Sequence, residues 1–182
     1  DPNPGATRIE DCVFVGNGAG LWSFLSTDVQ RTRFENNWLS LRCIGEVYLT
    51  DVEVTGSGND WGVNHPPFGA AGLLLPGAHG RLERVRVHHN TIAQGLPGIW
   101  IEQGPFELVQ CEVHDNQSAL GPSGISAIRV GSMRLRQCTL RANHSRGPAF
   151  PVGGLFVDRS EVRAEGCRIE SNDSGDRGSG MS

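Results

Sequence analysis

The 182 residues carry 16 basic and 20 acidic side chains, and the net charge of −4 gives no general attraction to nucleic acid or to an anionic membrane surface. Hydrophobic residues make up 37% of the chain, and no apolar run approaches the roughly 20 residues that a membrane-spanning helix needs. Glycine is abundant, at 25 residues, as expected of a chain rich in turns. We therefore expect a globular protein without a nucleic-acid partner and without a membrane span.

A short phrase returns seven times between positions 8 and 172. It consists of a small or apolar residue, any residue, an apolar residue, two spacers and then usually asparagine. The seven phrases end at Asn17, Asn37, Ser57, Asn90, Asn116, Asn143 and Asn172, in steps of 20, 20, 33, 26, 27 and 29 residues. Self-similarity on this scale predicts a solenoid, because each unit buries its apolar face only against its neighbours. Residues 1–7 are then an N-terminal extension, and residues 173–182, rich in glycine and serine, a tail or linker.

The fourth unit shows the organisation of one coil. Residues 80–87 carry apolar side chains separated by polar ones, and a glycine-containing connection at 91–97 leads to 98–101, Gly-Ile-Trp-Ile, which alternates with period two. Each coil is therefore predicted to hold three short strands with corners between them. Because no hairpin turn follows the strands, we expect them to pair with the neighbouring coils, in parallel and in register.

Apolar side chains recur at equal positions of successive units and predict the core. One column lies three residues before each phrase and consists of Ile9, Val29, Leu49, Leu82, Leu108, Leu135 and Ala164. A second predicted column consists of Leu41, Leu73, Ile99, Ile128 and Leu155. Four cysteines open their phrases where other coils have valine, namely Cys12, Cys111, Cys138 and Cys167. We expect inward thiols that pack as small hydrophobes, with disulfides between stacked neighbours as the alternative.

Two further columns alternate in charge and are predicted to face outward. The middle residue of the phrase runs through Arg33, Glu53, Arg86 and Glu112, and the residue before the phrase runs through Asp11, Arg31, Asp51 and Arg84. A positive and a negative side chain that face each other on neighbouring strands stabilise a sheet, so these residues are explained as ladder pairs between coils.

Asparagine at the end of the phrase is predicted to hold a tight corner, since it tolerates a left-handed backbone and its amide can bond to the amide of the next coil. The phrase, followed by Gly-Ile-x-Ile or Gly-Leu-x-Val, resembles the right-handed parallel β-helix repeat of the pectate-lyase-like superfamily from about Arg8 to Asn172. This resemblance implies an all-β, right-handed parallel β-helix of about seven coils. It also implies a choice among polysaccharide lyases, glycoside hydrolases, uronan epimerases, phage-tail depolymerases and non-catalytic surface domains.

Four titratable residues are the candidates for catalysis. His89 and Asp115 precede the asparagines of adjacent coils, so at equal phase they are predicted to stack as a general base and its orienting partner. Asp60 and His65 lie in an insertion that leaves the same corner, and long loops of a solenoid often lie on its binding face.

Five residues are the candidates for binding a glycan. His88 and His114 are predicted to stack beside the asparagine column, and Trp61 and Phe68 of the insertion would offer apolar faces to sugar rings. Trp100 is predicted to point outward from its strand as a carbohydrate platform, because Ile99 and Ile101 beside it point inward.

No metal site and no cofactor is expected, since no Cys-x-x-Cys spacing occurs. The only tyrosine, Tyr48, alternates with apolar neighbours and lies in no recognisable motif. The leading prediction is a non-catalytic, rigid β-helix repeat domain of a secreted or cell-surface protein, with a polysaccharide as the partner along one groove. The alternatives are a carbohydrate-active enzyme, either a polysaccharide lyase or a glycoside hydrolase, and a self-assembling structural or filament protein. End-to-end self-association, or further coils in a longer chain, would cover the open ends.

Overall fold

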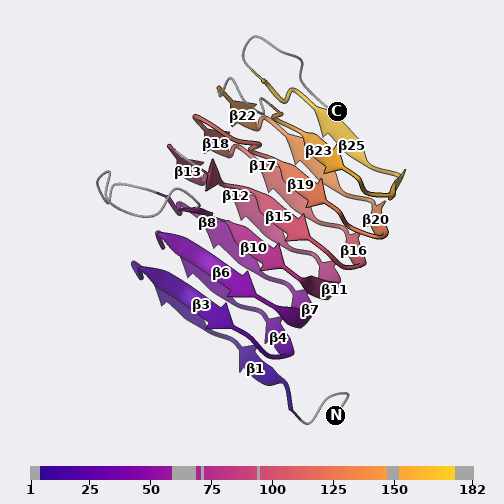
Figure 1. The fold of residues 1–182 in the computed structure, drawn as a ribbon. Helices are drawn as coiled ribbons and strands as arrows, with labels where there is room; N and C mark the ends of the chain where they lie inside the picture. The colour runs from indigo at the N-terminus through magenta and orange to yellow at the C-terminus, as the bar shows by residue number, and fades with distance from the viewer. Residues whose placement is uncertain (1–4, 59–68, 71, 94, 147–151, 175–182) are drawn as a thin grey trace.

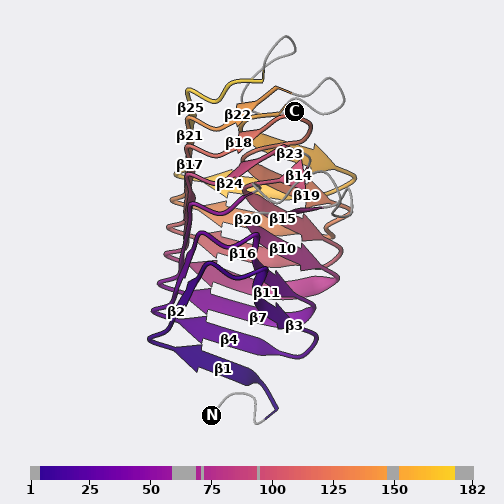
Figure 2. The ribbon, with the colours of Figure 1, turned by 90° about the vertical axis from the view of Figure 1, so that its left-hand side faces the viewer.

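The computed structural model describes residues 5–58, 69–70, 72–93, 95–146 and 152–174. These residues form a right-handed parallel β-helix whose coils stack along one axis from the N-terminal to the C-terminal end (Figure 1, Figure 2). The predicted fold class and the parallel pairing between coils are thus confirmed. Nowhere in these ranges does the chain form a helix long and apolar enough to cross a membrane.

Three parallel sheets make up the walls of the solenoid, as three strands per coil require. The first sheet consists of β1 (Thr7–Glu10), β4 (Thr27–Gln30), β7 (Gly45–Thr50), β11 (Ala78–Glu83), β16 (Phe106–Val109), β20 (Met133–Arg136) and β24 (Val162–Glu165). The second consists of β2 (Val13–Val15), β5 (Arg33–Glu35), β8 (Glu53–Thr55), β12 (Arg86–His88), β17 (Glu112–His114), β21 (Thr139–Arg141) and β25 (Arg168–Glu170). The third consists of β3 (Ala19–Ser23), β6 (Leu39–Cys43), β10 (Leu73–Pro76), β15 (Ile99–Glu102), β19 (Ile125–Ile128) and β23 (Leu155–Asp158).

Two small sheets follow the corner between the second and third sheets. One consists of β13 (Thr91–Ile92), β18 (Gln117–Ser118) and β22 (His144–Ser145), and the other of β9 (Gly69–Ala70) and β14 (Gly95–Leu96). These short ladders were not expected from the sequence, and they extend the pairing between coils into the connections that follow the phrases.

The core is a stack of inward side chains. Its first predicted column is confirmed in register throughout and is buried from Val29 to Leu135, whereas Ile9 is partly buried and Ala164, in the last described coil, is exposed. Ile9, Val29, Leu49, Leu82, Leu108, Leu135 and Ala164 pair in this order along the first sheet. The second predicted column is wrong at one position: Ile125, not Ile128, stacks between Ile99 and Leu155. Ile128 instead pairs with Glu102 and Asp158 and lies half-buried on the outer side of its strand.

All five cysteines are free thiols. Cys111 and Cys138, in central coils, are fully buried and belong to the apolar core, as predicted for small inward hydrophobes. Cys12 and Cys167 occupy the same column in the first and last described coils, where they are only partly buried.

The residue before the asparagine, and not the asparagine itself, adopts the left-handed backbone at the corner. His89, Asp115, Ala142 and Ser171 all have φ between 51° and 54°. The prediction that the asparagines take this conformation is therefore wrong, although the corner lies where the phrase ends. The left-handed residue turns the chain, and the next residue then points into the solenoid, where asparagine is fully buried in the central coils.

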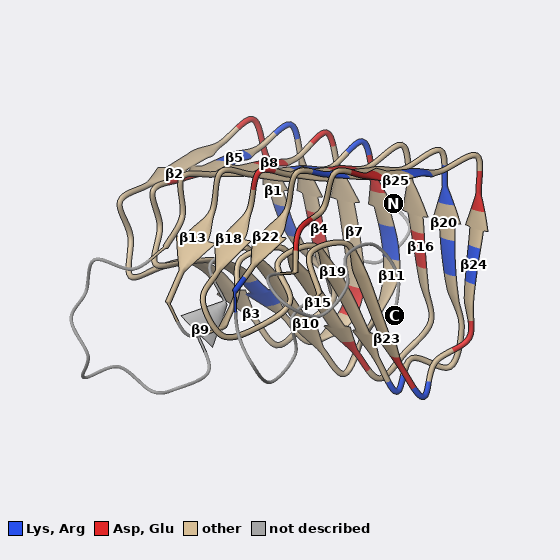
Figure 3. Cartoon of the chain, turned by 90° about the horizontal axis from the view of Figure 1, so that it is seen from above, with Lys and Arg blue, Asp and Glu red and all other residues tan. Residues whose placement is uncertain are grey.

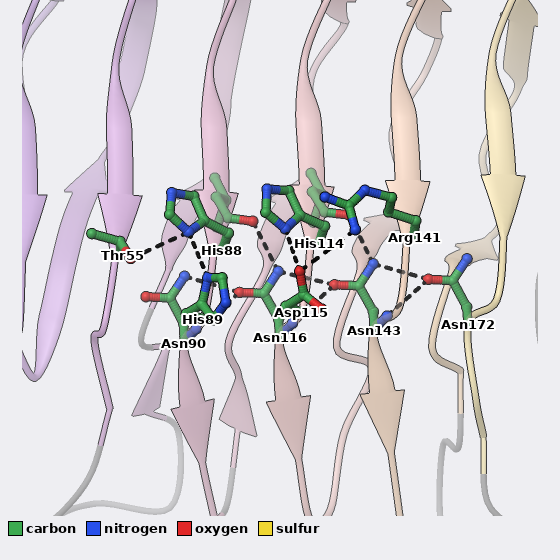
Figure 4. Close-up of polar contacts among 12 residues, drawn as sticks. Thr55, His88, His89, Asn90, His114, Asp115, Asn116, Arg141, Asn143 and Asn172 are labelled. Atoms are coloured by element: carbon green, nitrogen blue, oxygen red, sulfur yellow. Dashed lines mark hydrogen bonds and ion pairs between the residues drawn. The ribbon is translucent and has the colours of Figure 1, made fainter.

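The buried asparagines form a ladder along the solenoid, as Figure 4 shows for four of them. Asn116 is typical. Its Nδ2 donates to the carbonyl of Val87 and to Oδ1 of Asn143, both at 2.9 Å. Its own Oδ1 accepts from the backbone N–H of Asn90 at 3.2 Å and from Asn90 Nδ2 at 2.9 Å. The Asn116 amide is thus bonded on both its nitrogen and its oxygen, which removes the cost of burying it.

The charge ladders hold the coils in register from outside. Arg31 lies 2.7 Å from Asp11, and Arg84 makes a two-point contact with Asp51 at 2.7 and 3.0 Å. Both pairs join neighbouring coils, as the alternating signs predicted. The bond from Arg84 holds the pKa of Asp51 below its usual value.

Replacement of Asp51 by asparagine is expected to lower the free energy of unfolding at pH 7 by about 0.2–1 kcal/mol, the range for an exposed ion pair. Asparagine keeps the shape and tolerates the φ of 55° at this position. Because the pKa is lower in the folded state, the contribution of the pair is present above the unfolded pKa of about 3.9 and is lost as the pH falls through the folded value. Urea unfolding at pH 7 and at pH 3 measures the difference, which shrinks at the lower pH.

The matched control is Asp28→Asn, since Asp28 makes no ion pair with an arginine among the described residues. Equal losses at pH 7 in the two variants would show that the Arg84–Asp51 contact does not stabilise the stack.

Candidate functional site

A cluster of polar side chains, here called the histidine corner, lies where the second sheet meets the asparagine ladder (Figure 4). It consists of Glu53, Thr55, His88, His89, His114, Asp115 and Arg141. The fold brings these residues together because β8, β12, β17 and β21 are consecutive neighbours in one parallel sheet. His88 and His114 share one register position, and their rings stack with centroids 4.8 Å apart and planes within 3°.

His88 is held by bonds on both ring nitrogens. Its Nε2 lies 3.0 Å from a Glu53 carboxylate oxygen, and its Nδ1 lies 2.8 Å from Nδ1 of His89. A carboxylate only accepts, so Nε2 carries the proton, and Nδ1 of neutral His88 accepts from His89. Burial lowers the pKa of His88, which favours this neutral form, and the bond from His88 lowers the pKa of Glu53.

Asp115 is paired with the histidine of its own coil. His114 Nδ1 lies 2.6 Å from a carboxylate oxygen of Asp115, and Arg141 of the next coil lies 3.7 Å from the same oxygen. Burial acts to raise the pKa of Asp115, but the bond from His114 and the neighbouring positive charges hold it below the usual value. The predicted equal phase of His89 and Asp115 holds, yet the hydrogen-bonded partner of the carboxylate is His114.

The remaining candidates from the sequence are not gathered at this corner. Asp60, Trp61, His65 and Phe68 lie outside the described residues. Trp100 lies on the outer side of β15 in the third sheet, as predicted, where it is half-buried and its Nε1 is covered. A platform for sugar rings needs an accessible aromatic face, and Trp100 offers less of one than the sequence suggested.

An open groove of about 580 Å³, here called the arginine groove, lies on the outer face of the first sheet. The arginine groove consists of Tyr48, His79, Arg81, Glu107, Arg134, Glu161 and Arg163. Its central row runs from Tyr48 through Arg81, Glu107 and Arg134 to Arg163, each directly opposite the next in the ladder. At one strand spacing per step this row is roughly 19 Å long.

Within the arginine groove, Tyr48 is 43% exposed. Its hydroxyl donates to Glu46 at 2.7 Å, which fixes the ring on the surface of β7. Arg81 lies 2.7 Å from Glu107, so these two charges compensate one another.

The far end of the arginine groove breaks the rule of alternating charges. Arg134 and Arg163 are directly opposite one another on β20 and β24, and Figure 3 shows basic segments side by side on these strands. Arg163 lies 3.4 Å from Glu161, whereas Arg134 makes no ion pair within 4.0 Å among the described residues. Like charges at such positions destabilise a sheet. The groove as a whole contains three arginines and two glutamates, although the net charge of the chain is −4.

Reasoning from the sequence missed this groove. Its residues alternate with core residues and lie in five different coils, so each appears in the sequence as an ordinary outward strand residue. The available signal was the same-phase run of Arg134 and Arg163, which an alignment of coils on the first sheet would have exposed.

Exposed apolar side chains gather at the first coil and its following turn, where Val13, Val15, Trp22, Phe24 and Leu25 are each more than half exposed. End-to-end association, or further coils, stays a prediction for this surface. Comparison of the chain with protein-family models, with curated proteins and with solved structures found no match.

Proposed function

We propose that this chain is a non-catalytic, rigid β-helix domain that binds an acidic polysaccharide along the arginine groove, as part of a secreted or cell-surface protein. The repeat phrase and its buried asparagines support placing it with the pectate-lyase-like β-helices. The observation that carries the proposal is the stacked pair Arg134 and Arg163. A like-charge pair costs stability in a ladder that elsewhere alternates, so an anionic ligand that bridges the two guanidinium groups repays that cost.

The groove suits an extended polymer more than a small molecule. It is open and follows the solenoid axis across five coils. One end carries the arginine pair, and the other end carries the exposed ring of Tyr48. Arginine binds carboxylate groups through two parallel hydrogen bonds, and a tyrosine face can pack against a sugar ring. A polymer of uronic acids offers both features at each repeat.

Chemistry of the groove favours binding over turnover. Glu107 lies 2.7 Å from Arg81, and Glu161 lies 3.4 Å from Arg163. Glycoside hydrolysis needs one carboxyl group whose pKa is raised so that it can donate a proton. Both glutamates of the groove are instead held in ion pairs with its arginines.

Native gel electrophoresis through immobilised polygalacturonate tests this proposal, with neutral dextran as the comparison polymer. The protein is expected to be retarded by polygalacturonate only, and the retardation is expected to weaken as salt is added. The double variant Arg134→Gln/Arg163→Gln is expected to migrate as it does without polymer. Its free energy of unfolding is expected to stay equal or to rise by about 0.2–1 kcal/mol, because the repulsion between the two arginines is gone.

The control is Arg168→Gln, which removes one exposed arginine from the second sheet. Equal loss of retardation in this control would show that only net charge matters. Release of unsaturated products or new reducing ends from polygalacturonate would overturn the non-catalytic part of the proposal.

A further inference from the structure

The histidine corner places three potential metal ligands from two consecutive coils within reach of one another. One ligand atom each of His89, His114 and Asp115 lies within 4.8 Å of the other two. Ligands of a tetrahedral zinc ion, at 2.0–2.1 Å from the metal, are separated by about 3.3 Å. His89 therefore needs to approach the other two ligands by about 1.5 Å at most, whereas His114 Nδ1 and the Asp115 oxygen, 2.6 Å apart, need to open by about 0.7 Å. Rotation of exposed His89 and half-buried Asp115 can supply both changes.

We propose that His89, His114 and Asp115 bind a divalent transition-metal ion, with Zn²⁺ as the reference ion. Two imidazoles and one carboxylate form a ligand set that suits zinc and its neighbours, and three protein ligands leave a position for water. This site lies at the carboxyl ends of β12 and β17 in the second sheet, whereas the arginine groove lies on the first sheet, so the inference does not rest on the proposed function. No linear zinc motif marks this site, since its ligands come from two coils and meet only when the coils stack.

Backbone geometry makes the site rigid. His89 and Asp115 have nearly identical left-handed backbones, each with φ of 54°, at equal positions of adjacent coils. Each is followed by a buried asparagine of the ladder, so neither corner can shift without breaking that ladder. His114 is only 12% exposed and stacks on His88, which fixes its ring plane.

Neighbouring groups prepare the ligands for a cation. Glu53 accepts a hydrogen bond from Nε2 of His88, so Nδ1 of His88 accepts a hydrogen bond from Nδ1 of His89. The proton of neutral His89 is then on Nδ1, and its Nε2 has a lone pair for a metal ion. In metal centres a carboxylate commonly orients the ligating histidine directly, whereas here Glu53 acts on the ligand His89 through His88. At His114 the metal would replace the proton that Nδ1 shares with Asp115. Arg141, 3.7 Å from Asp115, is the one cation that competes for this carboxylate among the described residues.

Isothermal titration of the chelator-treated full chain with ZnCl₂ is the test. One Zn²⁺ is expected to bind per chain, and His89→Asn and Asp115→Asn are each expected to weaken binding at least about tenfold. Asparagine tolerates the left-handed corner at both positions, so these variants keep the fold. Glu53→Gln is expected to weaken binding by about tenfold through loss of its hold on His88. Arg141→Gln is expected to strengthen it.

The control is His79→Ala, which removes an exposed histidine from the first sheet and is expected to leave zinc binding unchanged. Zinc bound by the buried thiols instead would give a sulfur-to-metal absorption band when Co²⁺ replaces Zn²⁺, and His89→Asn would not change it. Absence of binding, or binding that persists in both His89→Asn and Asp115→Asn, would overturn the proposal.

Discussion

Replacement of Gly98 by alanine is expected to destabilise the fold by more than about 3 kcal/mol, at or beyond the upper end of overpacking effects. A Cβ atom on Gly98 would lie 1.9 Å from the carbonyl oxygen of Gly124 and 2.5 Å from that of Ser123. Both contacts are far inside van der Waals distance, and both partners are backbone atoms that cannot rotate away. The Gly124 carbonyl also accepts the N–H of Ile99 at 3.0 Å, so separating the coils breaks the ladder at this point.

The control for this prediction is Gly131→Ala, because a Cβ atom on Gly131 meets no atom within 4 Å. Both substitutions restrict the unfolded chain equally, so this effect cancels in the comparison. Urea unfolding followed by circular dichroism gives the two free energies. Gly131→Ala is expected to stay within about 0.5 kcal/mol of the parent protein. Similar transition midpoints for both variants would mean that the coils can separate at Gly98 without loss.

Replacement of Asn116 by alanine is expected to destabilise the protein by about 3 kcal/mol or more. Asn116 is fully buried, and its removal leaves the N–H of Asn90, the carbonyl of Val87 and the amide oxygen of Asn143 each short of a partner. Each buried polar group without a partner costs about 1–3 kcal/mol. The cavity left by the side chain adds to this loss, and the same unfolding experiment measures the sum.

Asn17→Ala is the matched control, since Asn17 occupies the same column in the first coil but is exposed to solvent. Its Nδ2 donates to Asn37 at 3.0 Å, and water can replace this bond. A loss of about 1 kcal/mol or less is expected for Asn17→Ala. If the two asparagines contributed equally, burial of the ladder would not be the source of its effect.

The recurring phrase predicted the solenoid, the parallel register and the first inward column correctly. Leu82, Leu108 and Leu135 stack directly on one another because they keep a constant distance from the phrase within each coil. The prediction failed at Ile128 because the other coils connect the phrase to the third sheet by different lengths, which hid the spacing shared by two neighbours. Nine residues separate Asn116 from Ile125, as nine separate Asn90 from Ile99, and the stacking of Ile125 between Ile99 and Leu155 follows that spacing.

The candidate sites show the same division. The sequence placed His88, His114 and Asp115 in one region, since these residues lie at fixed positions beside the asparagines. It paired Asp115 with the wrong histidine, because the left-handed corner turns the Asp115 side chain toward His114 in its own coil. Tyr48 belongs to no motif of the sequence, because the arginine groove forms only when the coils stack.

The architecture of this protein follows from its sequence alone, since a period of 20–33 residues with inward apolar positions and a closing asparagine is compatible with one kind of stack. Tertiary structure alone decided which outward residues meet. Residues of adjacent coils are separated by 20 or more positions in the chain yet by one strand spacing of about 4.8 Å in space. The adjacency of Arg134 to Arg163, and of His89 to the His114–Asp115 pair, therefore follows from the length of each connection and the sign of φ at each corner.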